Sequence, residues 1–170
     1  STMGFSPLDG LPMGTRSGQI DPGVLLYLMQ EDGMDGAAIS DLLYRKSGLL
    51  GLSGQSNDMR QLEASDHIHA RQAIDYFVYR CQREIGSLAA ALGGIDALVF
   101  CGGIGENARG VRAGICGGLG WMGIAVDAAR NAANDMRLST HGAAVTVLTV
   151  PTDEEGVIAA AARRLSQGLG

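Results

Sequence analysis

A glycine-rich segment directly after an apolar run carries the clearest sign of chemistry in this sequence. Gly102-Gly103-Ile104-Gly105-Glu106-Asn107 follows the apolar residues Ala97–Cys101. Glycines after a buried strand let backbone N–H groups and a helix N-terminus approach a nucleotide closely. The segment lacks the Lys and Ser/Thr of a Walker A motif. It therefore predicts a nucleotide-binding loop, with an ordinary glycine-rich turn as the alternative.

The same glycines also fit a dinucleotide-binding pattern. Gly103, Gly105 and Ala108 satisfy G-x-G-x-x-A, and Asp127 follows at a distance that suits a ribose. Glu106 argues against this interpretation, because a carboxylate beside the second glycine would repel a pyrophosphate unless it turns away. A loop that touches the sugar or the base tolerates such a carboxylate. A dinucleotide-binding module is therefore the alternative function.

A polar cluster, Gly54–Arg60, offers a second set of candidate ligand contacts. The Asp58 carboxylate can accept hydrogen bonds from ribose hydroxyls or an adenine amine. Arg60 can stack on a ring or pair with phosphate. The competing interpretation is that Ser56 or Asn57 caps a short helix.

Two charged residues elsewhere could act on a phosphoryl group. Arg16 lies between small residues in the segment 13–18, where a planar guanidinium could reach a transferred phosphoryl group. A solvated surface arginine is the alternative. Near the C-terminus, Thr152 and Glu155 match a capping box, which leaves Glu154 without a local role. Glu154 could hold Mg²⁺ or serve only the helix dipole.

These residues must be positioned by helices and strands that the apolar periodicity predicts. Residues 1–21 have no periodicity and indicate an extended loop. We expect helices from Pro22 with Asp21 as its cap, over Ala37–Lys46 with Gly48 as its end, over Asp66–Leu92, after the Gly102–Asn107 loop up to about Cys116, and from Pro151 to Leu165. Buried strands are expected over Ala97–Cys101 and Ala144–Val150.

Strand, loop and helix thus follow one another twice, after a long amphipathic helix. This order predicts an α/β fold whose functional loops lie at the carboxyl ends of the strands. At 170 residues, 46% of them hydrophobic, the chain has the size and core material of one domain.

Charge and composition exclude several classes of function. The net charge of -5 comes from scattered residues, so no basic face is available for nucleic acid. No apolar stretch approaches the roughly 20 residues of a membrane span, and no signal peptide is evident, which predicts a cytoplasmic protein. Cys81, Cys101 and Cys116 form no CxxC pair, and we expect all three to be small buried hydrophobes.

Taken together, five segments resemble the acetokinase family of the actin-like, hexokinase-like and Hsp70-like ATPase superfamily. In order they are Ser1–Gly10, Met13–Gly18, Ser53-Gly54 with Ser56–Arg60, Gly103–Asn107 and Pro151–Glu155. The resemblance covers essentially the whole chain. It implies an actin-like α/β lobe of ribonuclease H-like type and Mg²⁺- and ATP-dependent phosphorylation of acetate by direct in-line transfer.

The resemblance also implies roles for individual residues. Arg16 matches the arginine that contacts the transferred phosphoryl group and the substrate carboxylate, and Pro7 matches a wall of the acyl pocket. The nucleotide site would consist of Asp58, Met59, Arg60, Gly103, Ile104, Gly105, Glu106 and Asn107. Glu154 matches a Mg²⁺-associated glutamate. Propionate or butyrate in place of acetate remains open.

By the same resemblance, residues 1–170 correspond to a C-terminal nucleotide-binding and dimerisation lobe. The family's N-terminal lobe, with its other catalytic residues, would lie upstream of Ser1. We therefore expect a homodimer and expect this chain alone to be inactive. Two departures from the family pattern are Gln19, where an acidic residue is expected and which could alter the environment of Arg16, and Cys101-Gly102 before the glycine segment.

Overall fold

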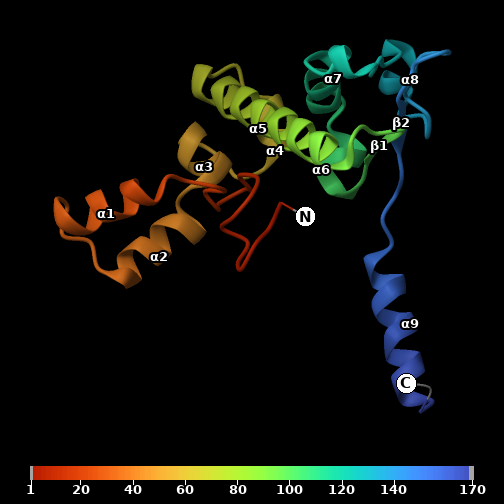
Figure 1. Cartoon of the computed structure of the whole chain (residues 1–170). Coiled ribbons are helices and arrows are strands. Elements are labelled where there is room, and N and C mark those ends of the chain that lie inside the picture. Colours follow the sequence, from red (N-terminus) through yellow and green to blue (C-terminus); the bar gives the residue numbers. More distant parts are fainter. Residues whose placement is uncertain (1, 169–170) are drawn as a thin grey trace.

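The computed structural model describes residues 2–168 of the chain. Its helices are α1 Pro22–Gln30, α2 Gly36–Arg45, α3 Gly48–Ser53, α4 Met59–Glu63, α5 Ile68–Leu92, α6 Gly102–Asn107, α7 Arg109–Gly117, the 3-10 helix η1 Gly120–Met122, α8 Ala128–Ala133 and α9 Glu154–Ser166. Its strands are β1 Ala97–Phe100 and β2 Thr146–Thr149. Figure 1 shows α1 and α2 at one end of the molecule and α9 extending away from the rest at the other.

The two strands form a parallel pair. Ala97 lies opposite Thr146 and Phe100 opposite Thr149. The strand β1 leads into α6, and β2 leads towards α9 (Figure 1). The carboxyl ends of both strands therefore meet at one edge, as the predicted α/β class requires.

The long helix α5 organises the core. It packs against α3, α4 and α7, and Gly93 ends it in the left-handed conformation with φ 76°. Its buried face includes Ala70, Ala73, Phe77 and Cys81, which join the principal apolar cluster. The predicted long helix is confirmed, and the sharp glycine stop fixes how the chain enters β1.

One prediction about β1 is wrong. The apolar run indicated a strand buried on both faces, yet Val99 is 47% exposed and Ala97 is exposed, while Phe100 is buried. In residues 2–168 the sheet has only two strands. Side chains alternate between the faces of a strand, and the described elements leave the Val99 face partly uncovered.

Gly48 was expected to end α2 but instead begins α3. Helix α2 already ends at Arg45. Gly48 has φ 62°, and a Cβ atom there would collide with the carbonyl oxygens of Met13 and Arg16. Glycine is thus required at this position because the segment containing Arg16 passes directly over it.

The start of α9 also differs from the predicted capping box. Asp153, not Thr152, is the N-cap, and its Oδ1 accepts a hydrogen bond from Gly156 N at 2.9 Å. The Thr152 hydroxyl donates instead to Glu106 Oε1 at 3.0 Å. The long-range partner displaces the local one because the fold brings Glu106 within hydrogen-bond reach.

Two of the three cysteines are buried as expected. Cys81 and Cys116 lie in the core, whereas Cys101 is exposed at the end of β1, which corrects the third prediction. Within residues 2–168, no helix combines the length and apolar character needed to cross a bilayer.

Candidate functional site

The segment containing Arg16 is a loop tied to the junction of α2 and α3. Ser17 N donates to Leu43 O at 3.1 Å, and Ser47 N donates to Thr15 O at 3.0 Å. The Thr15 hydroxyl donates to Tyr44 O at 2.8 Å. These bonds fix the backbone on both sides of Arg16, so a loop residue acquires a defined position without belonging to a helix.

Arg16 faces a cavity of about 760 Å³, which we call the Arg16 cavity. It is lined by Met13, Gly14, Thr15, Arg16, Ala37, Ser40, Asp41, Tyr44, Arg45 and Asn57. Asp41 is already paired with Lys46 at 2.6 Å. In the part of the chain that the structure describes, no carboxylate pairs with Arg16, and its Nη1 has only Met13 Sδ at 3.5 Å. The guanidinium can therefore receive an anion.

A second cavity, of about 660 Å³, brings the two predicted nucleotide-binding segments together. This Asp58 cleft is lined by Asn57, Asp58, Met59, Arg60, Glu63, Gly103, Ile104, Asn107 and Ala108. Two segments more than 40 residues apart in the sequence thus share one concave surface. Nothing within 4 Å would meet a Cβ atom at Gly103, so its backbone is open to a ligand.

Asp58 and Arg60 face each other rather than acting separately. The guanidinium donates through Nε and Nη2 to the two carboxylate oxygens, at 3.1 Å and 2.6 Å. Asp58 also caps α4 by accepting from Arg60 N at 2.9 Å. The side-chain hydrogen bonds from Arg60 lower the pKa of Asp58 below its usual value. A ligand would meet an ion pair here, with the flat face of the guanidinium still available for stacking.

The glycine segment is a helix, α6, rather than the expected loop, and its residues face different ways. Asn107 lines the Asp58 cleft and donates through Nδ2 to Gly103 O at 2.9 Å. A Cβ at Gly105 would meet Phe100 at 3.3 Å, so this glycine allows α6 to pack against β1. Glu106 accepts from Gly102 N and Thr152 N, each at 2.9 Å. Neither Gly105 nor Glu106 lines the cleft.

The other predicted site residues lie in less direct positions. Met59 lines the cleft but is only 4% exposed, so most of its side chain belongs to the core. Pro7 is half-buried in the N-terminal segment and does not line the Arg16 cavity. Glu154 begins α9, but its side chain falls outside what the structure describes. Among the described residues, no group of three or more His, Cys, Asp or Glu side chains could hold a metal.

Sequence reasoning missed two buried arginines that hold the site together. Arg112 is 0% exposed and donates through Nη1 to Gly105 O at 2.9 Å and Glu106 O at 2.7 Å. Its Nη2 also reaches Asn134 Oδ1 at 2.7 Å. Arg112 therefore fixes the end of α6. Arg112 belongs to the buried face of α7 together with Val111 and Ile115. Its position among these apolar residues was the sequence signal that could have predicted a buried arginine.

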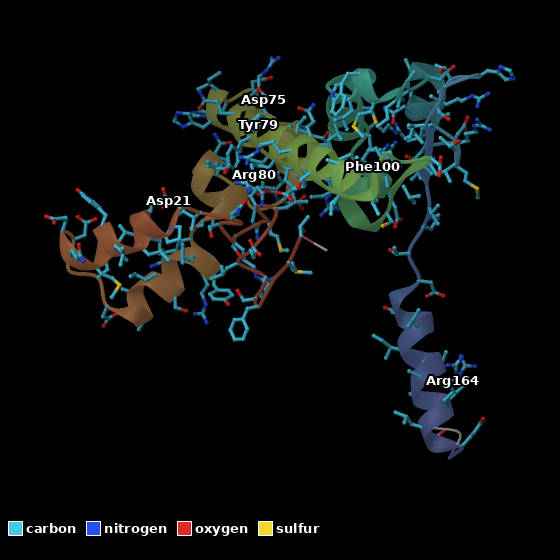
Figure 2. All side chains as sticks on the ribbon, viewed as in Figure 1. Asp21, Asp75, Tyr79, Arg80, Phe100 and Arg164 are labelled. Carbon is cyan, nitrogen blue, oxygen red and sulfur yellow. The ribbon has the colours of Figure 1, made fainter. Side chains whose placement is uncertain are left out.

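Arg80, labelled in Figure 2, reaches from α5 to the N-terminal segment. It is 4% exposed and donates to Gly10 O at 3.3 Å and to both Gln19 O and Gln19 Oε1, at 3.2 and 3.3 Å. Gln19 was expected to affect Arg16, but its side chain contacts Arg80 instead.

The structure argues against the alternative of a dinucleotide-binding module, because Asp127, its expected ribose-binding residue, has another role. Asp127 is the N-cap of α8, and its carboxylate accepts from Arg130 N at 3.0 Å. The pattern glycines Gly103 and Gly105 lie within α6 instead of forming the tight turn of a dinucleotide fingerprint.

Comparison with known proteins agrees with the resemblance seen in the motifs. Residues 1–160 match the acetokinase family. An acetate kinase of Methylocella silvestris is 60% identical over 159 residues, which make up 94% of this chain and 39% of that protein. An acetate kinase of Rhodopseudomonas palustris is 54% identical over 170 residues, or 99% of this chain and 43% of that protein. The chain thus spans about two fifths of the length of these relatives.

Solved structures share the fold. Porphyromonas gingivalis acetate kinase superposes with a TM-score of 0.90 and 43% identity, covering 94% of this chain and 42% of that chain. A propionate kinase from Francisella tularensis gives a TM-score of 0.88 and 37% identity, covering 93% of this chain and 41% of that chain. The predicted fold class is confirmed. Because the family match extends over nearly the whole sequence, this chain belongs to the acetokinase family.

Proposed function

We propose that this chain is the nucleotide-binding part of an enzyme that phosphorylates acetate with ATP, reversibly, to give acetyl phosphate and ADP. Residues 1–170 would form the C-terminal lobe of a two-lobe kinase. One observation carries the proposal: the Asp58 cleft adjoins the Arg16 cavity, and Asn57 lines both. A nucleotide bound in the cleft would direct its phosphates towards Arg16, the arginine predicted to act on the transferred phosphoryl group.

Arg16 is the proposed catalytic and substrate-binding residue. In-line transfer from the γ-phosphate to a carboxylate oxygen spreads negative charge over the transferred phosphoryl group. A guanidinium fixed in a loop and lacking a carboxylate partner in the described residues can stabilise that charge without first breaking another ion pair. Pro7 keeps its proposed role as a wall of the acyl pocket.

The proposed nucleotide contacts divide into direct and supporting ones. Asp58, Arg60, Gly103, Ile104 and Asn107 line the cleft and would touch the nucleotide. Met59, Gly105 and Glu106 would act by holding these residues in place. Mg²⁺ commonly uses only one or two protein carboxylates together with substrate phosphates. Glu154 is the proposed protein carboxylate, and the bound ion would neutralise phosphate charge.

Acetate is the first substrate to test, and propionate or butyrate is the alternative. An added methylene changes binding in an apolar pocket by only about 1–3 kcal/mol. The solved relatives include a propionate kinase as well as acetate kinases. A homodimer and a cytoplasmic location remain further proposals, and light scattering at several concentrations tests the first.

Nucleotide binding to this chain tests the proposal directly. Calorimetric titration should give saturable binding of MgADP, no comparable binding of NAD, and weaker MgADP binding after Asp58→Ala. Asp127→Ala is the matched control, because Asp127 caps α8 as Asp58 caps α4 but lies outside the cleft. Equal losses in both variants, or binding of NAD alone, would contradict the assignment.

Turnover is a separate measurement. Because the chain spans only about two fifths of its relatives, we expect no measurable formation of acetyl phosphate by this chain alone. Trapping the product with hydroxylamine would detect it, and robust turnover would show that residues 1–170 hold a complete active site.

A further inference from the structure

Asn57 occupies the junction between the Arg16 cavity and the Asp58 cleft. In the described part of the chain it is the residue that the linings of these two cavities share. The sequence motif around Asn57 predicts no role for it beyond a possible helix cap, and Asp58 provides that cap instead. The function of the Asn57 side chain is therefore open.

The backbone around Asn57 is held firmly from two sides. Ser53 Oγ accepts from Ser56 N at 3.2 Å and donates to Ser56 O at 3.1 Å, and Asp58 N donates to Ser56 Oγ at 3.0 Å. From the other side, Gly14 approaches so closely that a Cβ atom there would lie 3.0 Å from Asn57 O. The loop of Arg16 and the segment of Asp58 thus meet at Asn57.

The Asn57 side chain itself is exposed, and within residues 2–168 it has no hydrogen bond or ion pair. A carboxamide carries two N–H donors and one acceptor oxygen. Other polar side chains at this junction are engaged: Ser56 with Gln61, Asp58 with Arg60, and Thr15 with Tyr44. Asn57 therefore presents free donors on a fixed backbone between the two cavities.

Building on the proposed function, we propose that Asn57 binds the phosphate chain of the nucleotide, donating its side-chain N–H to the β- or γ-phosphate. Within the described residues, a nucleotide with its nucleoside beside Asp58 and its transferred phosphoryl group beside Arg16 would pass over this junction, because Asn57 lines both cavities. A neutral amide supplies a directional hydrogen bond there without adding a further cation. Arg16 then remains the cation that stabilises the charge on the transferred phosphoryl group.

Comparing nucleotides that differ only in phosphate number tests this role. Calorimetry would measure MgATP, MgADP and AMP binding to the wild-type chain, Asn57→Ala and Asn57→Asp. Losing a hydrogen bond to a charged phosphate should weaken ATP and ADP binding about tenfold, with AMP changed by about twofold or less. Asn57→Asp should weaken ATP and ADP binding further, because its carboxylate repels the phosphates.

Gln55→Ala is the matched control. Gln55 is an exposed neighbour whose Oε1 accepts from Ser65 Oγ at 3.0 Å, and it lines neither cavity. It should leave all three affinities unchanged. Thermal unfolding of the two Asn57 variants should match the wild type, because the Asn57 side chain makes no hydrogen bond or ion pair within the described residues.

The outcomes are distinct. A loss confined to ATP and ADP supports the assignment. Unchanged ATP binding in Asn57→Ala overturns it, and so does an equal loss for AMP, which would place the contact on the nucleoside. If the wild-type chain binds no nucleotide at all, the proposed function fails for this chain, and the role of Asn57 fails with it.

Discussion

Glu106 Oε1 accepts hydrogen bonds from Thr152 N at 2.9 Å and from Thr152 Oγ1 at 3.0 Å. The same oxygen accepts from Gly102 N at 2.9 Å. One carboxylate oxygen thus joins the segments that follow β1 and β2. This contact turns Glu106 away from the Asp58 cleft, which explains how an acidic residue can follow Gly105 in a segment proposed to hold a nucleotide.

Removing the Glu106 carboxylate should release Thr152. In Glu106→Ala, the Thr152 amide should exchange with solvent about fivefold to tenfold faster, because its acceptor is lost. Glu106→Gln keeps an acceptor oxygen and should retain most of the protection. Hydrogen exchange read by NMR measures this. Glu155→Ala is the control, and faster exchange of Thr152 in that variant would revive the capping box that the structure contradicts.

The ion pair of Asp58 and Arg60 sets a pH dependence. Hydrogen bonds from Arg60 lower the pKa of Asp58 from its usual 3.8. A carboxyl whose pKa is lower in the folded chain contributes stability that is present above the unfolded pKa and is lost as pH falls through the folded one. Asp58 should therefore stay ionised throughout the neutral range and down to below pH 3.8.

An NMR titration of the Asp58 carboxyl carbon checks this direction. The midpoint should lie below 3.8 in the wild type and move up towards the usual value in Arg60→Met. Arg71→Met, which changes an exposed arginine on α5, should leave the midpoint unchanged. A midpoint unmoved by the loss of Arg60 would mean that the pair does not persist in solution.

Local signals in the sequence predicted the start of α1 and the end of α5 correctly, whereas α3, η1 and α8 were not predicted. Asp21 and Pro22 begin α1, and Gly93 ends α5, because caps and glycine stops act within a few residues. The sequence also singled out both segments that line the Asp58 cleft, Asp58 to Arg60 and the segment around Gly103, while their binding of a nucleotide stays a prediction. Each of these segments could be recognised from its own residues, polar side chains in the first and glycines in the second.

The predictions that were wrong concern contacts between residues far apart in the sequence. Thr152 meets Glu106 across 46 residues of sequence, and no local pattern distinguishes that bond from a capping box. The exposure of Val99 depends on which elements cover β1. Asn57 could be placed at a junction only once the path of Gly14 was known. Sequence periodicity reports the faces of an element but not its neighbours.

Arg112 should be among the most sensitive positions in the chain. Its guanidinium bonds Gly105 O, Glu106 O and Asn134 Oδ1 while fully buried. Arg112→Met would leave these acceptors unpaired, and should lower the free energy of unfolding by about 3 kcal/mol.

Urea unfolding measures this cost. The control is Arg109→Met, an exposed arginine on the same helix α7, where a change within about 0.5 kcal/mol is expected. Similar costs for the two variants would show that the buried network around Arg112 contributes little to stability.

The three cysteines should differ sharply in reactivity. Burial raises the pKa of Cys81 to about 12 and of Cys116 to about 11, so at pH 8 roughly one thiol in a thousand or fewer is ionised at each. Cys101 is exposed beside α6. A thiol reagent should label Cys101 at least about a hundredfold faster than the other two, by mass spectrometry.

Cys101 lies outside the Asp58 cleft, but its labelling should also respond to a ligand bound at α6. It directly precedes Gly102, so MgADP bound against α6 should slow its labelling. Cys101→Ser should abolish the fast phase without altering MgADP affinity. A fast phase that persists in Cys101→Ser would mean that Cys81 or Cys116 opens to solvent.

Gln19→Glu should stabilise the chain. Arg80 is buried and bonds the neutral Gln19 Oε1 at 3.3 Å, while its nearest carboxylate, on Glu84, is 3.9 Å away. A carboxylate at position 19 would turn a neutral hydrogen bond into a charge-assisted one. Because Gln19 is exposed, the gain should be about 1 kcal/mol, or about 2–4 °C in Tm.

Calorimetric unfolding with a double-mutant cycle isolates this contact. The gain from Gln19→Glu should vanish in an Arg80→Met background, because the new carboxylate then faces no cation. Gln30→Glu, which adds the same charge at the exposed end of α1, should give no gain. Arg80 holds the N-terminal segment against α5. A gain in stability that survives Arg80→Met would therefore mean that residue 19 acts on the Arg16 loop by a route that does not involve the Arg80 guanidinium.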